Sequence, residues 1–360
     1  MKFRKPFLLP FLLLPLLGSC GGQATPKEVL LDLGSYANRS PETGITKDNT
    51  IETIAYSKLS SLVYEKRSFL FLVKGSADSC MCWNAFLNNC LGPYVHAKHL
   101  LVYSMTLTEL NKESDKYGLK MVDGYDTMAI FEDGKLVEQK CYAEDEKFGY
   151  DAPTFNAWMD QRIIAPKAYY VDQKQLDKLY EGQDPLGQTT SKFAIYFGRD
   201  TCPDCSYMSR VDMKEYFAQR KSASLPLYYF DCDVWPTEVY AAKKEEYGLS
   251  PTKDNPYAYS KGAFPFVASI VPNNGEKIKT IDQVGVFYND TIDEGTITDS
   301  YFSKERAEDP ELGLNGSLSY AAKVDPNILV GQKVDLSLPR HLQLSPYHKP
   351  LLFALLDEIL

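Results

Sequence analysis

The sequence predicts an α/β protein built from two similar domains, each a three-layer sandwich of helices around a mixed central sheet. Residues 68–75 (SFLFLVKG) and 192–198 (KFAIYFG) both have the pattern of a buried strand. Each is followed by a glycine-containing loop, a pair of cysteines and a helical pattern, and each copy later reaches a hairpin signal, Asp133-Gly134 or Asn274-Gly275. A strand–helix–strand series that closes with a hairpin, used twice, predicts two such sandwiches.

The composition is that of a globular protein. The chain has 360 residues, of which 44% are apolar and 24% are charged, which is enough for two hydrophobic cores. No internal apolar run reaches the roughly 18 residues that a membrane-spanning helix needs, and this excludes a polytopic membrane protein. The formal net charge of -9 disfavours nucleic acid as a partner. Four histidines are few for a histidine-based metal enzyme, and we expect no metal or other cofactor.

Residues 1–19 have the layout of a secretory signal. Lys2, Arg4 and Lys5 precede an apolar stretch, residues 7–17, that is too short to span a membrane as a mature helix. The segment ends in Leu-Gly-Ser-Cys20, which resembles the lipobox of bacterial lipoproteins. The resemblance implies cleavage before Cys20, lipid attachment to Cys20 and anchoring at the extracytoplasmic face of the cell membrane. The alternative is a plain secreted protein with a chance cysteine.

Three parts are expected beyond the signal. Residues 20–46 are rich in small, polar and turn residues and are expected to form a lipidated tether, although the VLLDL run within it could dock elsewhere. Residues 47–165 are expected to form the first domain, and residues 166–360 the second, with an insertion at about residues 286–343 whose role the sequence does not indicate. The expected helices cover residues 49–67, 154–163, 173–181, 203–221 and 350–360, and further strands cover residues 100–105, 127–131, 135–139, 225–232 and 266–271.

The cysteines are the most informative residues for function. The eight cysteines are Cys20, Cys80, Cys82, Cys90, Cys141, Cys202, Cys205 and Cys232. If Cys20 is lipidated, an odd number remains, so at least one thiol is free or pairs between chains in a compartment that permits disulfides. The closest pairs are Cys80-Met-Cys82 and Cys202-Pro-Asp-Cys205, and each pair follows a strand-like run.

The second copy resembles a thioredoxin-fold domain. Cys202-Pro-Asp-Cys205 matches the CxxC motif between a strand and a helix, and residues 263–267 (AFPFV) followed by Asn274-Gly275 match the cis-proline strand and its hairpin. The resemblance implies that Cys202 is the nucleophile and Cys205 the resolving thiol. It also implies that Phe264 and the cis-proline Pro265 form the substrate-binding edge. The first copy resembles the same fold more weakly, and together the two resemblances cover about residues 46–285.

The chain departs from the family pattern at several positions. Thr201 stands where thioredoxins usually carry tryptophan, and Tyr196 stands where they bury an acid that assists proton transfer, so the proton relay for Cys205 is open. In the first copy the cysteine pair is C-x-C, and Asp126 occupies the cis-proline position. A cis bond before a residue other than proline costs about 2.5–4 kcal/mol, so the bond preceding Asp126 is expected to be trans. This copy is a candidate for loss of the exchange reaction.

Thiol–disulfide exchange needs an exposed thiolate with a second thiol in reach. Cys202 is expected at the N-cap of the helix over residues 203–221, with Pro203 at the first helical position. The free amides and the helix dipole at that end lower a thiol pKa. Asp200 and Asp204 oppose this, each by at most about 0.7 of a unit if exposed. We therefore expect a lowered pKa for Cys202.

Other roles remain open for both cysteine pairs. Cys202 and Cys205 could instead form a structural disulfide, or a metal half-site completed by Cys232 and Cys90. Cys80 and Cys82 are a possible second redox site, with structural thiols or a metal site as alternatives. That metal site would gather Cys80, Cys82, Cys90, His96 and His99. Cys90 and Cys141 are expected to be structural, Cys232 structural or a third reactive thiol, and Trp83 a core residue or a substrate-facing aromatic.

These observations favour a membrane-anchored, extracytoplasmic thiol–disulfide oxidoreductase. It would act on protein disulfides through the Cys202/Cys205 dithiol and exchange electrons with a separate redox partner. The sequence does not indicate the direction of electron flow. One alternative is a redox-inactive thioredoxin-fold lipoprotein that binds proteins or peptides. A metal chaperone that uses the cysteines is a further alternative.

Overall fold

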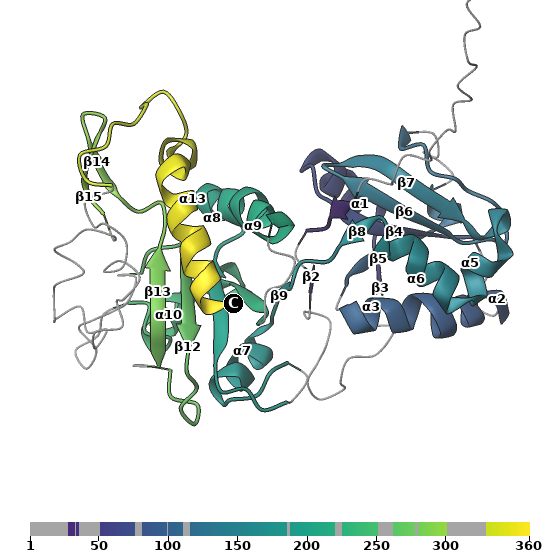
Figure 1. Ribbon diagram of the computed structural model, residues 1–360, viewed down its shortest axis with the longest axis horizontal. Coiled ribbons are helices and arrows are strands. Elements are labelled where there is room, and N and C mark those ends of the chain that lie inside the picture. The colour runs from purple at the N-terminus through teal and green to yellow at the C-terminus, as the bar shows by residue number, and fades with distance from the viewer. Residues whose placement is uncertain are drawn as a thin grey trace, which may run out of the picture.

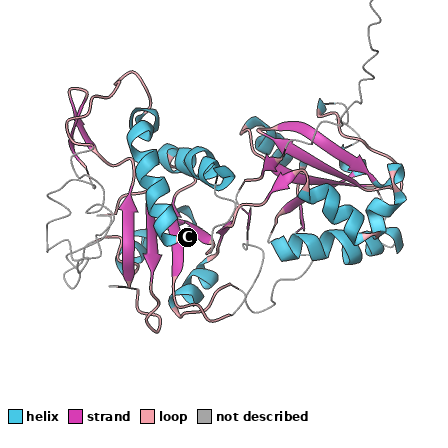
Figure 2. Cartoon of the chain, in the orientation of Figure 1, coloured by secondary structure: helices cyan, strands magenta, loops and turns pink. Residues whose placement is uncertain are grey.

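The computed structural model describes residues 28–32, 34–35, 51–75, 81–98, 100–110, 116–185, 188–219, 225–250, 262–277, 280–300 and 329–360. Figure 1 shows two lobes, each built around its own sheet with helices packed on the sheet faces. Figure 2 shows that both lobes contain helices and strands. The expectation of two α/β sandwiches is therefore confirmed.

The first sheet has five strands in the order β3-β5-β4-β6-β7. Its strands are β3 (Ile51–Thr53), β4 (Phe69–Lys74), β5 (Val102–Thr106), β6 (Thr127–Glu132) and β7 (Lys135–Cys141). Strands β3, β5 and β4 are parallel, whereas β6 and β7 are antiparallel to their neighbours. The helices of this lobe are α1 (Tyr56–Tyr64), α2 (Met81–Ala85), α3 (Gly92–Lys98), α4 (Leu107–Leu110), α5 (Glu146–Tyr150) and α6 (Ala152–Asp160), and a π-helical turn over Phe86–Leu91 joins α2 to α3.

The second sheet repeats the same order, β13-β12-β10-β11-β9, and adds the short strand β2 beside β9. Its strands are β9 (Ala168–Tyr170), β10 (Phe193–Gly198), β11 (Leu227–Asp231), β12 (Phe266–Ile270), β13 (Ile281–Val286) and β2 (Gly34–Ser35). In both sheets the chain runs from the first strand, β3 or β9, through a helix to the central strand, β4 or β10. It then returns to the strand between these two, β5 or β11, and closes with an antiparallel hairpin, β6-β7 or β12-β13. This is the strand order of the thioredoxin fold.

The central strands are apolar along their whole length because both sheet faces are covered. All six residues of β10 are buried, as are the first five of β4. A strand with helices on both faces needs a continuous apolar run rather than an alternating one. The runs that predicted the two domains are therefore the centres of the two sheets.

Four expected helices differ in the structure. The one expected over residues 154–163 is α6, which ends at Asp160, and Ile163 lies in strand β8 (Ile163–Ile164). Residues 51–53 form strand β3, and the first helix starts only at Tyr56. The helix expected over residues 203–221 contains a π-helical turn, Met208–Asp212, between α8 (Pro203–Tyr207) and α9 (Met213–Gln219). The final helix, α13, runs over Arg340–Ile359 and so begins well before residue 350.

Helix α13 contains two prolines, one of them at the residue where the expected helix begins. Pro346 and Pro350 are both exposed, one turn apart on the same face. A proline inside a helix frees the carbonyl four residues earlier. On this face the freed carbonyls can bond to water, while the opposite, leucine-rich face is buried in the second core.

Residues 29–32, from the VLLDL run, dock between the two lobes. Strand β1 (Val29–Leu30) pairs in parallel with β8 (Ile163–Ile164). Val29 and Leu31 are buried in the core of the first lobe, and Leu30 in that of the second. The backbone N–H of Asp32 donates to Ser68 O (2.8 Å). This segment therefore contributes apolar side chains to both cores.

Polar contacts also join the lobes. The Lys214 Nζ atom lies 2.8 Å from Ser68 Oγ and 3.1 Å from Asp133 Oδ1. Arg210 lies 3.4 Å from Glu65. Arg210 and Lys214 both belong to the helical residues that follow the Cys202 motif. These helical residues therefore form part of the interface between the lobes.

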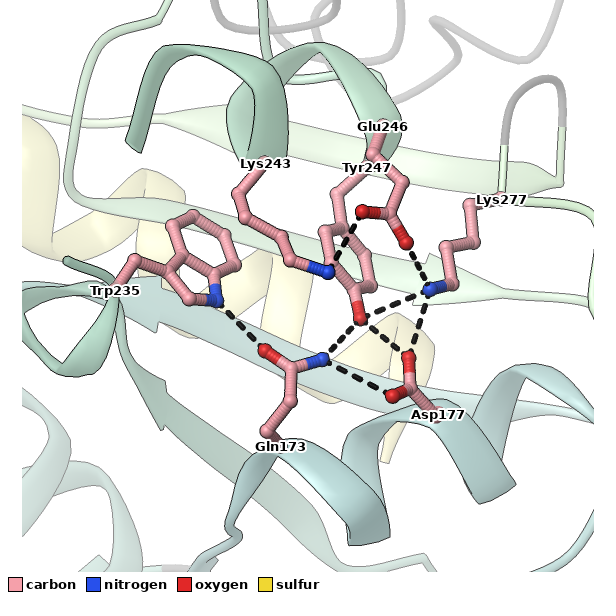
Figure 3. A network of polar contacts seen from close by, with 7 residues as sticks. All are labelled: Gln173, Asp177, Trp235, Lys243, Glu246, Tyr247 and Lys277. Carbon is pink, nitrogen blue, oxygen red and sulfur yellow. Dashed lines mark hydrogen bonds and ion pairs between the residues drawn. The ribbon is translucent and has the colours of Figure 1, made fainter. Parts of the chain in front are cut away.

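A polar network fixes one face of the second sheet (Figure 3). The Tyr247 hydroxyl, at the end of α10 (Thr237–Glu246), donates to Asp177 Oδ1 (2.6 Å) and accepts from Lys277 Nζ (3.1 Å). It also accepts from Gln173 Nε2 (2.5 Å), so it joins α7 (Gln173–Tyr180) and the segment before β13 to α10. Burial raises the pKa of Asp177, but the hydrogen bonds from Lys277 and Tyr247 outweigh it and leave the pKa lowered.

Removing this hydroxyl is expected to destabilise the second lobe. Tyr247→Phe keeps the buried ring but leaves Asp177, Gln173 and Lys277 without their shared partner. The expected loss in the free energy of unfolding is about 1–3 kcal/mol, measured by urea denaturation. Tyr64→Phe is the matched control, because that side chain is 89% exposed, and its expected change is within about 0.5 kcal/mol. Equal stabilities of Tyr247→Phe and the unsubstituted protein would contradict this role for the network.

Candidate functional site

Cys202 lies at the start of a helix at the end of the central strand. Strand β10 ends at Gly198, a short loop follows, and Cys202 is the N-cap of α8 with extended backbone (φ −85°, ψ 120°). Pro203 occupies the first helical position, as expected. Cys202 is half-buried and Cys205 is buried, and both are free thiols. The structure therefore brings the two cysteines of the second pair together as a dithiol.

The environment of Cys202 favours its thiolate. The S–H of Cys205 donates to the Cys202 sulfur, and the backbone N–H groups of Cys205 and Asp204 do the same. These hydrogen bonds lower the pKa of Cys202 from 9.0 to about 6, although burial and the charge of Asp204 oppose the shift. The expected direction is confirmed. The largest contribution to the lowered pKa comes from the hydrogen bond of the Cys205 thiol, whereas the contribution expected from the sequence was that of the helix terminus.

Cys205 remains a thiol under the same conditions. Its hydrogen bond to Cys202 and its burial both raise its pKa strongly, because a second thiolate beside the first is unfavourable. The hydroxyl of Tyr196 donates to the Cys205 carbonyl oxygen (3.0 Å) from below. Burial raises the pKa of Tyr196 well above 10.0, so this residue cannot serve as a base at neutral pH. The proton of Cys205 must therefore leave by another route.

Asp233 holds the loop that leads to Cys202. Its carboxylate accepts hydrogen bonds from Thr201 N (2.9 Å), Thr201 Oγ1 (2.6 Å) and Arg199 Nε (2.7 Å). Burial raises the pKa of Asp233, but these bonds outweigh it and lower the pKa overall. Asp233 is not among the site residues expected from the sequence. The sequence could have indicated Asp233, because it comes just after β11. The carboxyl ends of the parallel strands β10 and β11 lie at the same edge of the sheet, where Cys202 also lies.

Pro265 lies at that same edge. The Phe264–Pro265 bond is cis, as expected. Phe266, the first residue of β12, pairs with Phe197 near the end of β10, which places Pro265 opposite the strand end that leads to Cys202. Pro265 is buried and Phe264 half-buried. The Phe264 carbonyl accepts from Asn289 Nδ2 (2.9 Å), and the Pro265 carbonyl accepts from Phe287 N (3.0 Å).

A cleft of about 520 Å³ opens between the lobes beside the Cys202 loop. Asp200 and Asp231 border it from the second lobe, and Arg67 and Tyr103 from the first. Asp200 directly precedes Thr201 and Cys202. The first domain therefore forms one wall of a cleft beside the loop that leads to Cys202.

Comparisons with known proteins find only distant structural matches. No family model and no curated protein matches the chain. Among solved structures, the chain is similar to form I of human ERp44, at 11% identity over 81% of this chain and 61% of that one, with a TM-score of 0.35. The first two thioredoxin domains of Saccharomyces cerevisiae Eps1p match at 10% identity over 76% of this chain and 97% of that one, with a TM-score of 0.22. The bb fragment of ERp72 matches at 9% identity over 66% and 91%, with a TM-score of 0.28.

The chain thus spans between half and about three fifths of the ERp44 chains that it matches. At such identities and TM-scores these matches say nothing about activity. The thioredoxin-like fold of both lobes follows from the strand order and orientation in the two sheets.

The corresponding edge of the first domain is closed. The Gly75 N–H donates to Asp126 Oδ1 (3.0 Å), and the Gly75 carbonyl accepts from Gly124 N (3.0 Å). A Cβ atom on Gly75 would lie 2.1 Å from Tyr125 O, so only glycine fits this contact. The cis bonds among the described residues do not include Tyr125–Asp126, so the expected trans bond is confirmed.

Of the first cysteine pair, Cys82 is described, and Cys80 lies outside the described residues. Cys82 is disulfide-bonded, whereas Cys90, Cys141, Cys202, Cys205 and Cys232 are free thiols. Trp83 is buried in the first core, with Lys74 Nζ 4.3 Å from its ring centre, which supports the core interpretation of this residue. Cys20 and His99 also lie outside the described residues.

The remaining described cysteines, Cys90, Cys141 and Cys232, are buried free thiols. Burial, with the charge of Asp151, raises the pKa of Cys90 to about 11, and burial raises that of Cys232 well above 9.0. Cys141 is buried at the end of β7. No group of three or more histidine, cysteine, aspartate or glutamate side chains among the described residues is arranged to hold a metal ion. Within the same residues, no helix is both long and apolar enough to cross a membrane.

Proposed function

We propose that this protein is a thiol–disulfide oxidoreductase that acts on protein disulfides through Cys202 and Cys205. The observation that carries the proposal is the half-buried Cys202, with a pKa near 6, hydrogen-bonded to a second thiol beneath it. A thiolate at neutral pH with a resolving thiol in contact meets both requirements of the exchange reaction.

In the reductive direction, the Cys202 thiolate attacks one sulfur of a client disulfide. A mixed disulfide forms, and the other client sulfur leaves as a thiolate. Cys205 then loses its proton to solvent or to that departing thiolate, and its sulfur attacks the Cys202 sulfur. The second client thiolate leaves, Cys202 and Cys205 become a disulfide, and two electrons have passed to the client. A separate dithiol partner must return them. Oxidation of a client dithiol follows the same steps in reverse.

The two pKa shifts assign different roles to the two sulfurs. Cys202 is ionised at neutral pH and attacks or leaves readily, whereas Cys205 must first be deprotonated. A stabilised Cys202 thiolate also stabilises the reduced form over the disulfide, which cannot ionise. This makes the couple more oxidising than a dithiol of ordinary pKa.

The client-binding edge in this proposal is the backbone around Phe264 and Pro265. An extended client segment would add along this edge by main-chain pairing, with its disulfide above Cys202. The cleft beside Asp200 provides room for the adjoining residues of the client. Cys80 and Cys82 remain a proposed second redox site, in which the disulfide at Cys82 would be the reactive group.

Location belongs to the same proposal. Residues 1–19 would direct export, and the lipid on Cys20 would hold the protein at the extracytoplasmic face of the membrane. The domain over residues 166–360 would carry the reaction, and that over residues 47–165 would contribute a binding surface. An oxidising compartment suits both a disulfide at Cys82 and disulfide-containing clients.

Exchange kinetics test the activity. Reduction of insulin disulfides, with dithiothreitol as the electron source, is expected to be accelerated by the protein and lost in Cys202→Ser. Cys232→Ala is the matched control, because this buried thiol lies in the same domain outside the dithiol, and it should retain most of the rate. Equal rates for Cys202→Ser and the unsubstituted protein would refute the oxidoreductase and leave a redox-inactive binding module.

A further inference from the structure

A histidine distant in sequence contacts the Cys202 motif. His341, in the first turn of α13, has its Nδ1 atom 3.1 Å from Oδ1 of Asp204, which lies between the two cysteines. An ionised carboxylate only accepts hydrogen bonds, so His341 Nδ1 carries the proton and donates it. The side chains of His341 and Asp204 are 18% and 21% exposed, so solvent screens their interaction only in part.

Two contacts hold His341 in this position, one made by its own ring and one by the neighbouring residue. It stacks on Tyr207 of α8, with the ring centres 4.7 Å apart and the planes 25° apart. Its neighbour Arg340 donates through Nε to Tyr288 O (2.7 Å), and this fixes the start of α13 against the second lobe. The contact between His341 and the motif is therefore set by packing on both helices.

The negative charge of Asp204 opposes the Cys202 thiolate and raises its pKa. A carboxylate that already receives a charge-assisted hydrogen bond presents less of its negative charge to a neighbouring anion. We propose that His341 is a positioning residue for the Cys202/Cys205 couple, which holds the Asp204 carboxylate and so protects the reduced, anionic form of Cys202. This inference rests on the proposed oxidoreductase function and identifies a residue that tunes its redox balance.

Two substitutions of His341 separate the hydrogen bond from packing. His341→Phe keeps a ring on Tyr207 but removes the donor, whereas His341→Asn keeps an N–H group near the position of Nδ1. In His341→Phe the apparent pKa of Cys202, followed by ultraviolet thiolate absorbance, is expected to rise by about 0.5–1 unit. His341→Asn should stay close to the unsubstituted value. His96→Phe, in the first lobe, is the matched control and should leave Cys202 unchanged.

The redox equilibrium gives an independent readout. The equilibrium constant of the Cys202/Cys205 couple with glutathione should shift about three- to tenfold toward the disulfide in His341→Phe, a tenfold shift being about 30 mV. With Asp204→Asn as the background, His341→Phe should have less than about a twofold effect, because the charge that the histidine holds is gone.

Two results would overturn the inference. One is an unchanged Cys202 pKa and potential in His341→Phe, and the other is an equally large effect of His341→Phe in the Asp204→Asn background. If His341→Phe does not fold, Asp204→Asn is measured in its place. This variant should lower the Cys202 pKa, because it removes the charge that opposes the thiolate. An unchanged Cys202 pKa in Asp204→Asn would contradict the proposal. The thiolate titration needs no client, so its outcome is distinct from a failure of the exchange assay.

Discussion

Cys205→Ser is expected to hold client proteins on Cys202 as mixed disulfides. Cys202 would still attack, since a serine hydroxyl can donate to its sulfur as the Cys205 thiol does. The second attack would be lost, because among the described thiols Cys205 is the one that contacts Cys202. An intramolecular thiol has a very high effective concentration, so turnover should fall on the order of a hundredfold or more.

The trapped species is visible as a dithiothreitol-sensitive band on a non-reducing gel after mixing with a disulfide-containing client. Cys202→Ser combined with Cys205→Ser is the control and should give no such band. Cys205→Ala adds a second check, since it removes the donor to Cys202 and should raise the Cys202 pKa. Turnover by Cys205→Ser near that of the unsubstituted protein would contradict the assignment of Cys205 as the resolving thiol.

His348→Leu is expected to give the largest loss of stability. His348 Nδ1 accepts from Tyr288 N (3.1 Å), so its proton lies on Nε2, which donates to Asp290 Oδ2. Both side chains are 1% exposed, and the other oxygen of Asp290 has no hydrogen-bond partner among the described residues. Leucine would leave a buried carboxylate without a donor, which costs about 3–5 kcal/mol.

Urea denaturation measures this loss. A second variant, His348→Leu with Asp290→Leu, removes both polar groups and should recover much of the stability, because replacing a buried polar pair by apolar groups is often nearly neutral. A loss below about 1 kcal/mol in His348→Leu would show that the pair does not hold α13. Since α13 also carries His341, partial release of this helix should raise the Cys202 pKa as well.

The sequence predicted what local patterns determine. The uninterrupted apolar runs of β4 and β10 could only be central strands, and Pro203 after Cys202 identified a helix start. The resemblance of residues 263–267 and Asn274-Gly275 to the cis-proline strand and hairpin of thioredoxin-fold domains implied that Pro265 lies near Cys202. These features depend on neighbouring residues and on the period of side-chain burial, which a single sequence contains.

Features that depend on tertiary contacts were missed. The final helix was expected only from residue 350, and the sequence does not show that Pro346 and Pro350 both face solvent, where a helix tolerates them. Strand β3 has only three residues and was absorbed into a helical pattern. His341 meets Asp204 across 137 positions of sequence, and Leu30 enters the core of a domain that begins far along the chain. No local pattern indicates such pairings.

The titration of the Cys202 thiolate tests the central claim most directly. Its ultraviolet absorbance is followed against pH in the reduced protein, and the curve of Cys202→Ser is subtracted to remove other thiols. Cys202 should be protonated below and ionised above a pKa of about 6, so the exchange rate should rise with pH through that value and then level off. A midpoint near 6 agrees with a helix-tip thiolate supported by Cys205, and a midpoint at or above about 8.5, the value of an unperturbed thiol, would contradict it.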